Sequence, residues 1–269
     1  MAFSRTELLC YATLPDGYGF ENTLAAAAEA GFTELSLWLM SVDEGRQELG
    51  SLEAVKDCLD RHGLRATCLE LLLAWPSGDA SAADEELAVM QAAAAVLEPE
   101  IIMAGCMEPA MAERDRAAAL LKRQCRALAP LKVALEFLPW SAVPDIASAR
   151  TLAEAVDEDN LGYVFDSWHF ARSGLDYAAL AALPGDRIHF IQLSDAAPEA
   201  AGDIIAETLG GRLAPGEGVV DWSRLCAIFA ENGVNCPIGT EQYSDRVKAM
   251  SLPEACEYLY RSLDIVRQP

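Results

Sequence analysis

The sequence is poor in basic residues and in histidine. It has 20 Lys and Arg against 42 Asp and Glu, and with its three histidines counted as neutral the formal net charge is −22. A surface this acidic repels phosphate backbones and anionic lipids, so we expect neither a nucleic-acid partner nor a membrane partner. No apolar run approaches the roughly 18 residues needed to cross a bilayer, and the chain starts without an apolar signal core. These absences predict a cytoplasmic protein.

Paired cysteines and linkers are also missing. The eight cysteines are scattered, none forms a CxxC pair, and most have apolar neighbours. Free cysteine is among the most buried residue types, so we predict reduced, buried thiols rather than disulfides or zinc-cysteine sites. No Pro-rich or Ser-rich run divides the chain, and we therefore expect one domain over residues 1–269.

What is present is a regular alternation of helix and strand signals. Amphipathic stretches repeatedly end in a glycine, as at Gly31, Gly63 and Gly233, and a short apolar run follows. Glycine just past a helix provides a left-handed cap, so each instance indicates a helix end followed by a strand. Eight strand-like runs occupy residues 7–12, 33–38, 65–71, 100–105, 133–138, 162–165, 188–193 and 237–241. They predict a single-domain (β/α)8 TIM barrel, with an open α/β sheet as the alternative.

Polar residues interrupt the apolar strands near their carboxyl ends, where barrel enzymes carry their active sites. Side-chain alternation along each strand turns Glu136, Asp166, Gln192 and Glu241 toward the barrel interior. Carboxylates that converge without a partner repel one another, and no lysine lies near these strand ends. A divalent cation is the simplest answer, and an all-oxygen ligand set favours Mg²⁺ or Mn²⁺. For any single residue, the alternative is an ordinary carboxylate hydrogen-bonded to a loop.

The long segment of residues 194–220 follows the seventh strand and is expected to be irregular. It contains the glycine-rich stretch around Arg212, which could clamp a phosphate, a carboxylate or a sugar hydroxyl, or could pair with an acidic residue. Four tryptophans lie at or beyond strand ends, and they would form either aromatic walls around a ligand or packing within loops. They are Trp38, Trp75, Trp140 and Trp168.

The whole chain, with its specific motifs in the second half, resembles the xylose isomerase-like TIM barrels, a family of sugar and sugar-phosphate isomerases, epimerases and related dehydratases that also includes DNA-repair endonucleases. The resemblance rests on ALE at 134–136, FDSWH at 165–169, IQLSDA at 191–196, PGEG at 215–218, DW at 221–222 and GTE at 239–241. It implies that Glu136, Asp166, Gln192 and Glu241 hold the metal. Gln192 takes the place where the family usually has His.

The resemblance also implies an activity. The expected enzyme is a metal-dependent isomerase or epimerase of a sugar, a sugar phosphate or a related polyhydroxy carbonyl compound, with Glu136 and Glu241 moving a proton through an enediolate. A dehydratase of the dehydroshikimate type is the alternative, with His169 as the base, although the third strand has no Arg at its end to hold a substrate carboxylate. His169 is in either case expected to contact substrate, as are Arg212, Trp38 and Trp168.

Two further expectations concern assembly and catalytic competence. Many members of the family are homodimers or homotetramers. A non-catalytic accessory barrel stays open as a third possibility, because the substitution at Gln192 is one way in which a metal site decays. His62 and His189 are expected to be structural, and so few histidines argue against the histidine-rich site of the endonucleases.

Overall fold

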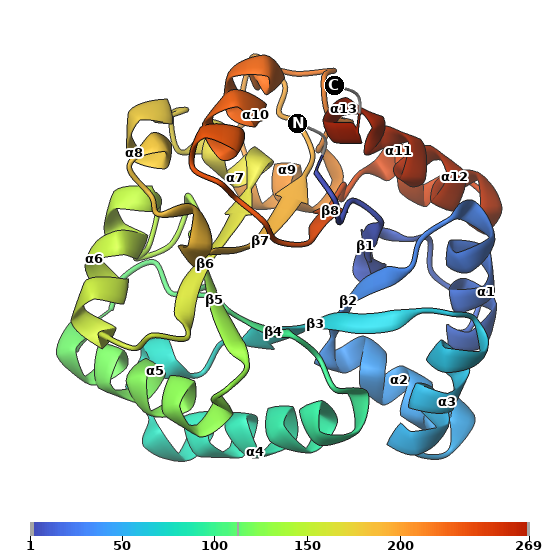
Figure 1. Ribbon diagram of the computed structural model, residues 1–269, viewed down its shortest axis with the longest axis horizontal. Helices are drawn as coiled ribbons and strands as arrows, with labels where there is room; N and C mark the ends of the chain where they lie inside the picture. Colours follow the sequence, from blue (N-terminus) through green and yellow to red (C-terminus); the bar gives the residue numbers. More distant parts are fainter. Residues whose placement is uncertain (1–2, 112, 268–269) are drawn as a thin grey trace.

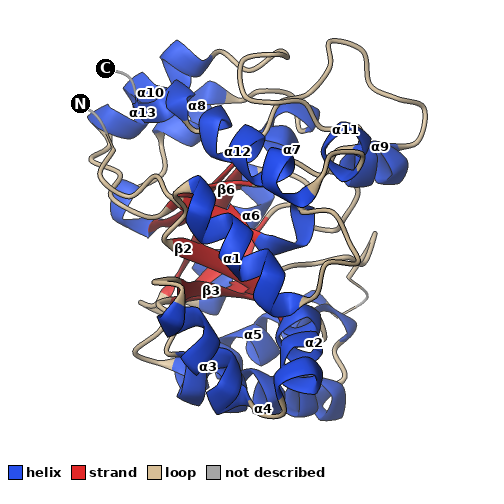
Figure 2. Cartoon of the chain, turned by 90° about the vertical axis from the view of Figure 1, so that its right-hand side faces the viewer, coloured by secondary structure: helices blue, strands red, loops and turns tan. Residues whose placement is uncertain are grey.

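The eight strands form a closed parallel barrel in sequence order, with β1 paired to both β2 and β8. The computed structural model describes residues 3–111 and 113–267. Helices surround the ring of strands in the view of Figure 1, and in the side view of Figure 2 the strands lie inside the layer of helices. The predicted (β/α)8 barrel is confirmed, and the open sheet is excluded.

Each predicted strand run overlaps one observed strand. The strands are β1 (Leu8–Cys10), β2 (Glu34–Trp38), β3 (Arg65–Leu72), β4 (Ile101–Ala104), β5 (Lys132–Glu136), β6 (Leu161–Asp166), β7 (Ile188–Leu193) and β8 (Ile238–Thr240).

The helices are α1 (Phe20–Ala30), α2 (Leu39–Leu49), α3 (Leu52–Arg61), α4 (Ala80–Leu97), α5 (Arg114–Leu128), α6 (Ile146–Val156), α7 (Ser167–Arg172), α8 (Tyr177–Ala181), α9 (Ile204–Gly210), α10 (Trp222–Glu231), α11 (Asp245–Lys248), α12 (Leu252–Ser262) and α13 (Asp264–Arg267).

Two short helices near the site, α7 and α9, were not expected from the sequence. The segment of residues 194–220 is not irregular throughout, because it contains α9. His169 lies on α7, which begins directly after β6. Figure 2 shows α7, α9 and α11 gathered on one side of the molecule, and an ion pair between Arg172 and Glu207 joins α7 to α9.

Side-chain alternation divides the barrel core into two layers. Val133, Leu135 and Phe165 pack in the large cluster between the strands and the surrounding helices. Ala134 and Val164 belong to the smaller cluster inside the barrel. This is the arrangement that strand parity predicts, and it turns the polar residues of the same strands inward.

Ion pairs close the amino-terminal end of the barrel. Glu34 begins β2 and accepts hydrogen bonds from Arg5 and Arg65, each at 2.8 Å. Arg5 also reaches Glu100 at 2.8 Å. The carboxylates at this end therefore have guanidinium partners. The carboxylates at the opposite end are the ones whose neutralisation has to be explained.

The cysteines behave as predicted. All eight are free thiols, and only Cys226 is partly exposed while the others are buried. Within residues 3–111 and 113–267, no helix combines the length and the apolar character needed to cross a membrane.

Candidate functional site

The carboxyl ends of the last four strands bring their polar residues together. β5 and β6 end at Glu136 and Asp166, β7 carries Gln192, and Glu241 directly follows β8. Their side chains are buried, with 6%, 1%, 0% and 4% exposure in that order. One ligand atom from each of Glu136, Asp166, His169 and Glu241 lies within 4.8 Å of the others, and we call these four residues the acidic site.

Arg212 supplies a positive charge that sequence reasoning did not place here. Its Nη1 donates to Asp166 Oδ2 at 2.7 Å and to Glu241 Oε2 at 2.9 Å. Its Nε and Nη2 donate to the carbonyl and hydroxyl oxygens of Thr208, both at 3.0 Å. The guanidinium is 3% exposed, so its contacts are with the protein. Of the alternatives left open for Arg212, the structure favours pairing with acidic residues, and those residues are buried rather than on the surface.

The DSWH motif works as a helix cap. Asp166 Oδ1 accepts the backbone N–H groups of Trp168 at 2.7 Å and His169 at 3.0 Å, which starts α7 directly at the end of β6. This turn places His169 Nε2 3.4 Å from Glu136 Oε1 and 3.6 Å from Asp166 Oδ2. Burial opposes ionisation of Asp166, but the charges of Arg212 and His169 and these backbone bonds hold its pKa well below the usual range.

Gln192 and Glu241 form a hydrogen-bonded pair at the barrel axis. Gln192 Nε2 donates to Glu241 Oε1 at 2.7 Å, while Gln192 Oε1 is buried without a hydrogen-bond partner. Burial raises the pKa of Glu241, and the nearby Asp166 and Glu136 charges add to this effect against the opposing influence of Arg212. An unpartnered buried oxygen is costly, so Gln192 Oε1 is available as a ligand atom for a cation.

The donor set fits a divalent cation. Three carboxylates and one imidazole converge in the acidic site, and the unpartnered Gln192 oxygen lies beside it. Oxygen donors suit Mg²⁺ or Mn²⁺, while the imidazole also suits Zn²⁺. A cation in this set would share Asp166 and Glu241 with Arg212. Each carboxylate oxygen has more than one acceptor direction, so the two partners are compatible.

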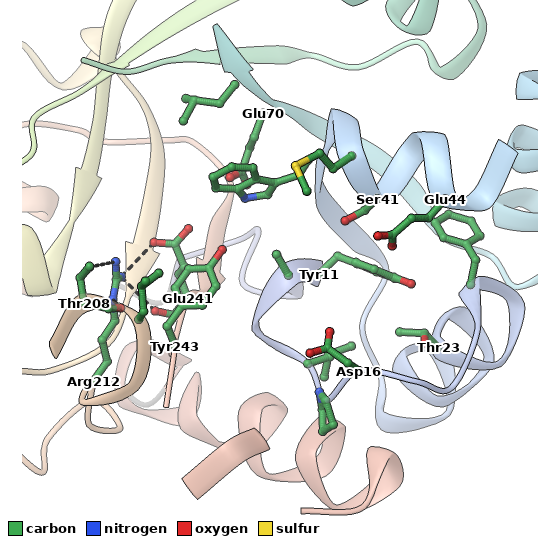
Figure 3. Close-up of a pocket in the computed structure, with 18 of the residues that line it drawn as sticks. Tyr11, Asp16, Thr23, Ser41, Glu44, Glu70, Thr208, Arg212, Glu241 and Tyr243 are labelled. Carbon is green, nitrogen blue, oxygen red and sulfur yellow. Dashed lines mark hydrogen bonds and ion pairs between the residues drawn. The ribbon is translucent and has the colours of Figure 1, made fainter. Parts of the chain in front are cut away.

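A cavity of about 460 Å³ opens onto the acidic site. Glu136, His169, Arg212 and Glu241 all line it. Trp38 and Trp140 contribute aromatic wall, whereas Trp75 and Trp168 are fully buried away from it. Figure 3 shows Arg212 joined to Glu241 and Thr208 on one side of the cavity, with Ser41 and Glu44 on the opposite side.

Trp168 was expected to contact substrate, but it does not line the cavity. Its ring packs against His169, with centroids 5.3 Å apart, and the Arg212 guanidinium lies 5.1 Å from its centroid. The motif that starts α7 turns this side chain behind the acidic site. Trp168 packs against His169 and Arg212, whereas Trp38 and Trp140 are the tryptophans that line the cavity.

Glu70 on β3 is a cavity residue that sequence reasoning missed. It is 2% exposed, lines the cavity and accepts a hydrogen bond from the Ser36 hydroxyl. Burial raises the pKa of Glu70 to about 8, with the charge of Glu136 adding to the shift. The alternation that found Glu136 would also have found Glu70, because Cys68 two residues earlier faces the barrel interior.

Asp195 holds the loop that carries Arg212. Its two carboxylate oxygens accept the backbone N–H groups of Ala196, Gly216 and Val220 and the indole N–H of Trp222, at 2.9 to 3.1 Å. Gly218 packs so closely that a Cβ there would lie 2.3 Å from the Ala196 carbonyl oxygen. The SDA, PGEG and DW motifs are thus parts of one structural clamp rather than a phosphate-binding loop.

The fold and this site define a (β/α)8 barrel protein with a metal-competent acidic site at the carboxyl ends of its strands. The chain matches the family described as xylose isomerase-like TIM barrel over residues 24–262, and it belongs to that family.

The curated relatives that it matches are named as dehydratases and isomerases. A 3-dehydroshikimate dehydratase of Pseudomonas aeruginosa is 32% identical over 120 residues, which are 44% of this chain and 19% of that protein. An inosose isomerase of Halalkalibacterium halodurans is 28% identical over 127 residues, 46% of this chain and 44% of that protein. These matched segments span less than half of each relative.

Solved structures share the barrel along its whole length. The IOLI protein with a bound zinc atom superposes with a TM-score of 0.85 at 20% identity, covering 96% of this chain and 97% of that one. A D-allulose 3-epimerase from Methylomonas sp. gives a TM-score of 0.72 at 19% identity, covering 100% and 96%. At these identities the likeness concerns the fold.

Proposed function

We propose that the protein is a divalent-metal-dependent isomerase or epimerase that acts on a sugar-like polyhydroxy carbonyl compound. The acidic site carries this proposal, because three carboxylates and an imidazole meet within 4.8 Å beside a cavity of about 460 Å³. The relatives named inosose isomerase and D-allulose 3-epimerase support it. Mg²⁺ or Mn²⁺ suits the oxygen-rich ligand set of Glu136, Asp166, Gln192 and Glu241.

A bound divalent cation supplies electrostatic stabilisation for negative charge that develops on the substrate oxygens. The proton is moved by the chain's own carboxylates. Among the described residues no hydrogen-bond donor engages Glu136, and His169 Nε2 lies 3.4 Å from its Oε1. Both oxygens of Glu241 already accept hydrogen bonds, from Gln192 and Arg212. Glu136 is therefore the base that removes the proton, and Glu241 is the group that returns one.

The position of His169 favours a dehydratase as the second candidate. Its Nε2 lines the cavity and faces both Glu136 and Asp166, so it can remove a proton in place of Glu136. Loss of a β-hydroxyl would then follow instead of proton return. The relative named 3-dehydroshikimate dehydratase supports this alternative. The two reactions share the site and differ in the product.

The test combines metal content with proton exchange. We expect purified protein to bind close to one equivalent of Mn²⁺ or Mg²⁺, to lose it to EDTA, and to exchange the C–H proton of an inosose or a ketose with solvent deuterium. Glu241→Gln and Glu136→Gln should each reduce this exchange by at least about 100-fold, in the range for loss of a general acid or base.

Glu217→Gln is the matched control, because Glu217 is an exposed carboxylate paired with Arg246 and lies outside the cavity lining. It should retain full metal binding and exchange. A new ultraviolet-absorbing conjugated product would identify the dehydratase. A metal-free protein, or a fully active Glu241→Gln enzyme, would refute the isomerase scheme.

A further inference from the structure

The cavity is lined by far more acid than base. The carboxyl residues among its described lining are Asp16, Glu44, Glu48, Glu70, Glu136 and Glu241. The same lining includes no lysine, and Arg212 is its one arginine. The large apolar side chains that remain exposed near the mouth are Tyr18, Met40, Met107, Ile205 and Leu209, and the exposed Glu44 and Glu48 lie among the same lining residues. Nothing in this lining steers an anion toward the acidic site.

Arg212 is already engaged by the protein. Its Nη1 donates to Asp166 and Glu241, and its Nε and Nη2 donate to Thr208. The remaining Nη2 proton faces His169 Nε2 at 3.5 Å. Recognition of a carboxylate or a phosphate by arginine uses two parallel N–H donors. Arg212 has no such free pair to offer a substrate.

A bound metal does not create a surplus of positive charge. Together with Arg212, a divalent cation only balances the three carboxylates of the acidic site. Glu70 adds a further carboxyl group, whose ligand atom lies within 4.8 Å of those of Cys10 and Glu241. An ionised Glu70 repels an anion, and a protonated Glu70 offers it only one neutral donor. Both states suit a hydroxyl group, which can donate as well as accept.

We propose that the site takes an uncharged polyhydroxylated ring or chain, and that Glu70 is the residue that excludes carboxylated and phosphorylated substrates. Glu70 is placed for this by β3, where it pairs with Trp38 of β2 and receives the Ser36 hydroxyl hydrogen bond. Figure 3 shows Glu70 and Glu241 on the wall of the same cavity. This inference rests on the proposed function, since it specifies the substrate of that site.

The test compares ligands that differ in charge and hardly in shape. Calorimetry would measure the dissociation constants of shikimate and of its uncharged methyl ester, with an inosose as a second uncharged ligand, for the Mn²⁺-loaded protein. The measurement is made above about pH 8, where Glu70 is ionised, because two like charges a few ångström apart in a partly buried site weaken binding about 100-fold. We therefore expect the ester to bind about 100-fold more tightly than the acid. Glu70→Gln should reduce this ratio at least tenfold, while Glu217→Gln should leave it unchanged.

The wild-type comparison needs no variant, so the proposal stays testable if Glu70→Gln does not fold. Binding of the acid as tightly as the ester would overturn it, and so would undetectable binding of both uncharged ligands. A ratio that is the same in Glu70→Gln and in wild type would remove Glu70 from the role. Calorimetry detects binding without turnover. A protein that shows the preference but exchanges no proton would thus refute the proposed function while supporting this inference.

Discussion

Replacing Arg212 with Met removes the guanidinium that contacts the acidic site and keeps an unbranched apolar side chain in its place. Asp166 and Glu241 would lose donors at 2.7 and 2.9 Å and remain buried. Breaking a buried ion pair by removing one partner costs about 3–5 kcal/mol, because the other charge is left uncompensated. We expect this loss in metal-free protein.

The expected change in melting temperature follows from the length of the chain. An unfolding entropy of about 2.1 cal/mol/K per residue gives roughly 0.56 kcal/mol/K for a domain of this size. A loss of about 3–5 kcal/mol then lowers the melting temperature by about 5–9 °C. Differential scanning calorimetry in the presence of EDTA would measure it. A metal-free Arg212→Met protein that melts with wild type would refute the assignment of Arg212 as the neutralising group.

Arg246→Met is the matched control for this measurement. Arg246 pairs with Glu217 at 3.2 Å, but both side chains are about half exposed, at 57% and 46%. Exposed pairs contribute about 0–1 kcal/mol, so the melting temperature should fall by less than about 2 °C. Added Mn²⁺ should raise the melting temperature of Arg212→Met more than that of wild type, because the variant site has greater negative charge.

Two further predictions concern stability away from the acidic site. Asp195→Ala leaves four N–H donors without their acceptor and should lower the free energy of unfolding by about 3 kcal/mol or more. Proteolysis within residues 196–220 should become faster. A variant as stable and as protease-resistant as wild type would contradict the role of Asp195 in holding this segment. Burial, reinforced by Lys132, lowers the pKa of His189 to about 4. Between that value and an ordinary pKa of about 6.5, the unfolded chain binds the additional proton, so stability falls as the pH falls through this window, by about 3 kcal/mol in total. His189→Gln should remove that part of the slope in urea titrations at several pH values, and parallel slopes in variant and wild type would rule out the effect.

The fold was predictable because its signals are local and repeated. A helix that ends at Gly31 or Gly233 and a following apolar strand recur along the chain, and alternation within each strand decides which side chains face inward. The same rule placed Glu136 and Asp166 at the carboxyl ends of their strands. Short helices were missed, because α7 and α9 are stabilised by caps at Asp166 and Asp203 rather than by periodicity.

Charge balance in the site was not predictable, because it depends on a loop. Arg212 is 46 residues from Asp166 and reaches it only because Asp195 folds the intervening segment back over the barrel. Sequence spacing carries no information on that path. Glu70 was missed for a different reason. Only an arginine was expected to matter at the end of the third strand, although alternation along that strand turns Glu70 inward.

Because Arg212 pairs with two of the three carboxylates, a bound metal is not required to neutralise them during folding. Without a cation from the protein, three buried carboxylates would depend on metal to fold at all, as structural metal sites do. Here Arg212 bonds two of them, and backbone N–H groups hold Asp166 from its other oxygen. The barrel can therefore fold without a metal, and its carboxylates would already be oriented for one. Such a site can exchange its metal without unfolding, which suits a catalytic ion rather than a structural one.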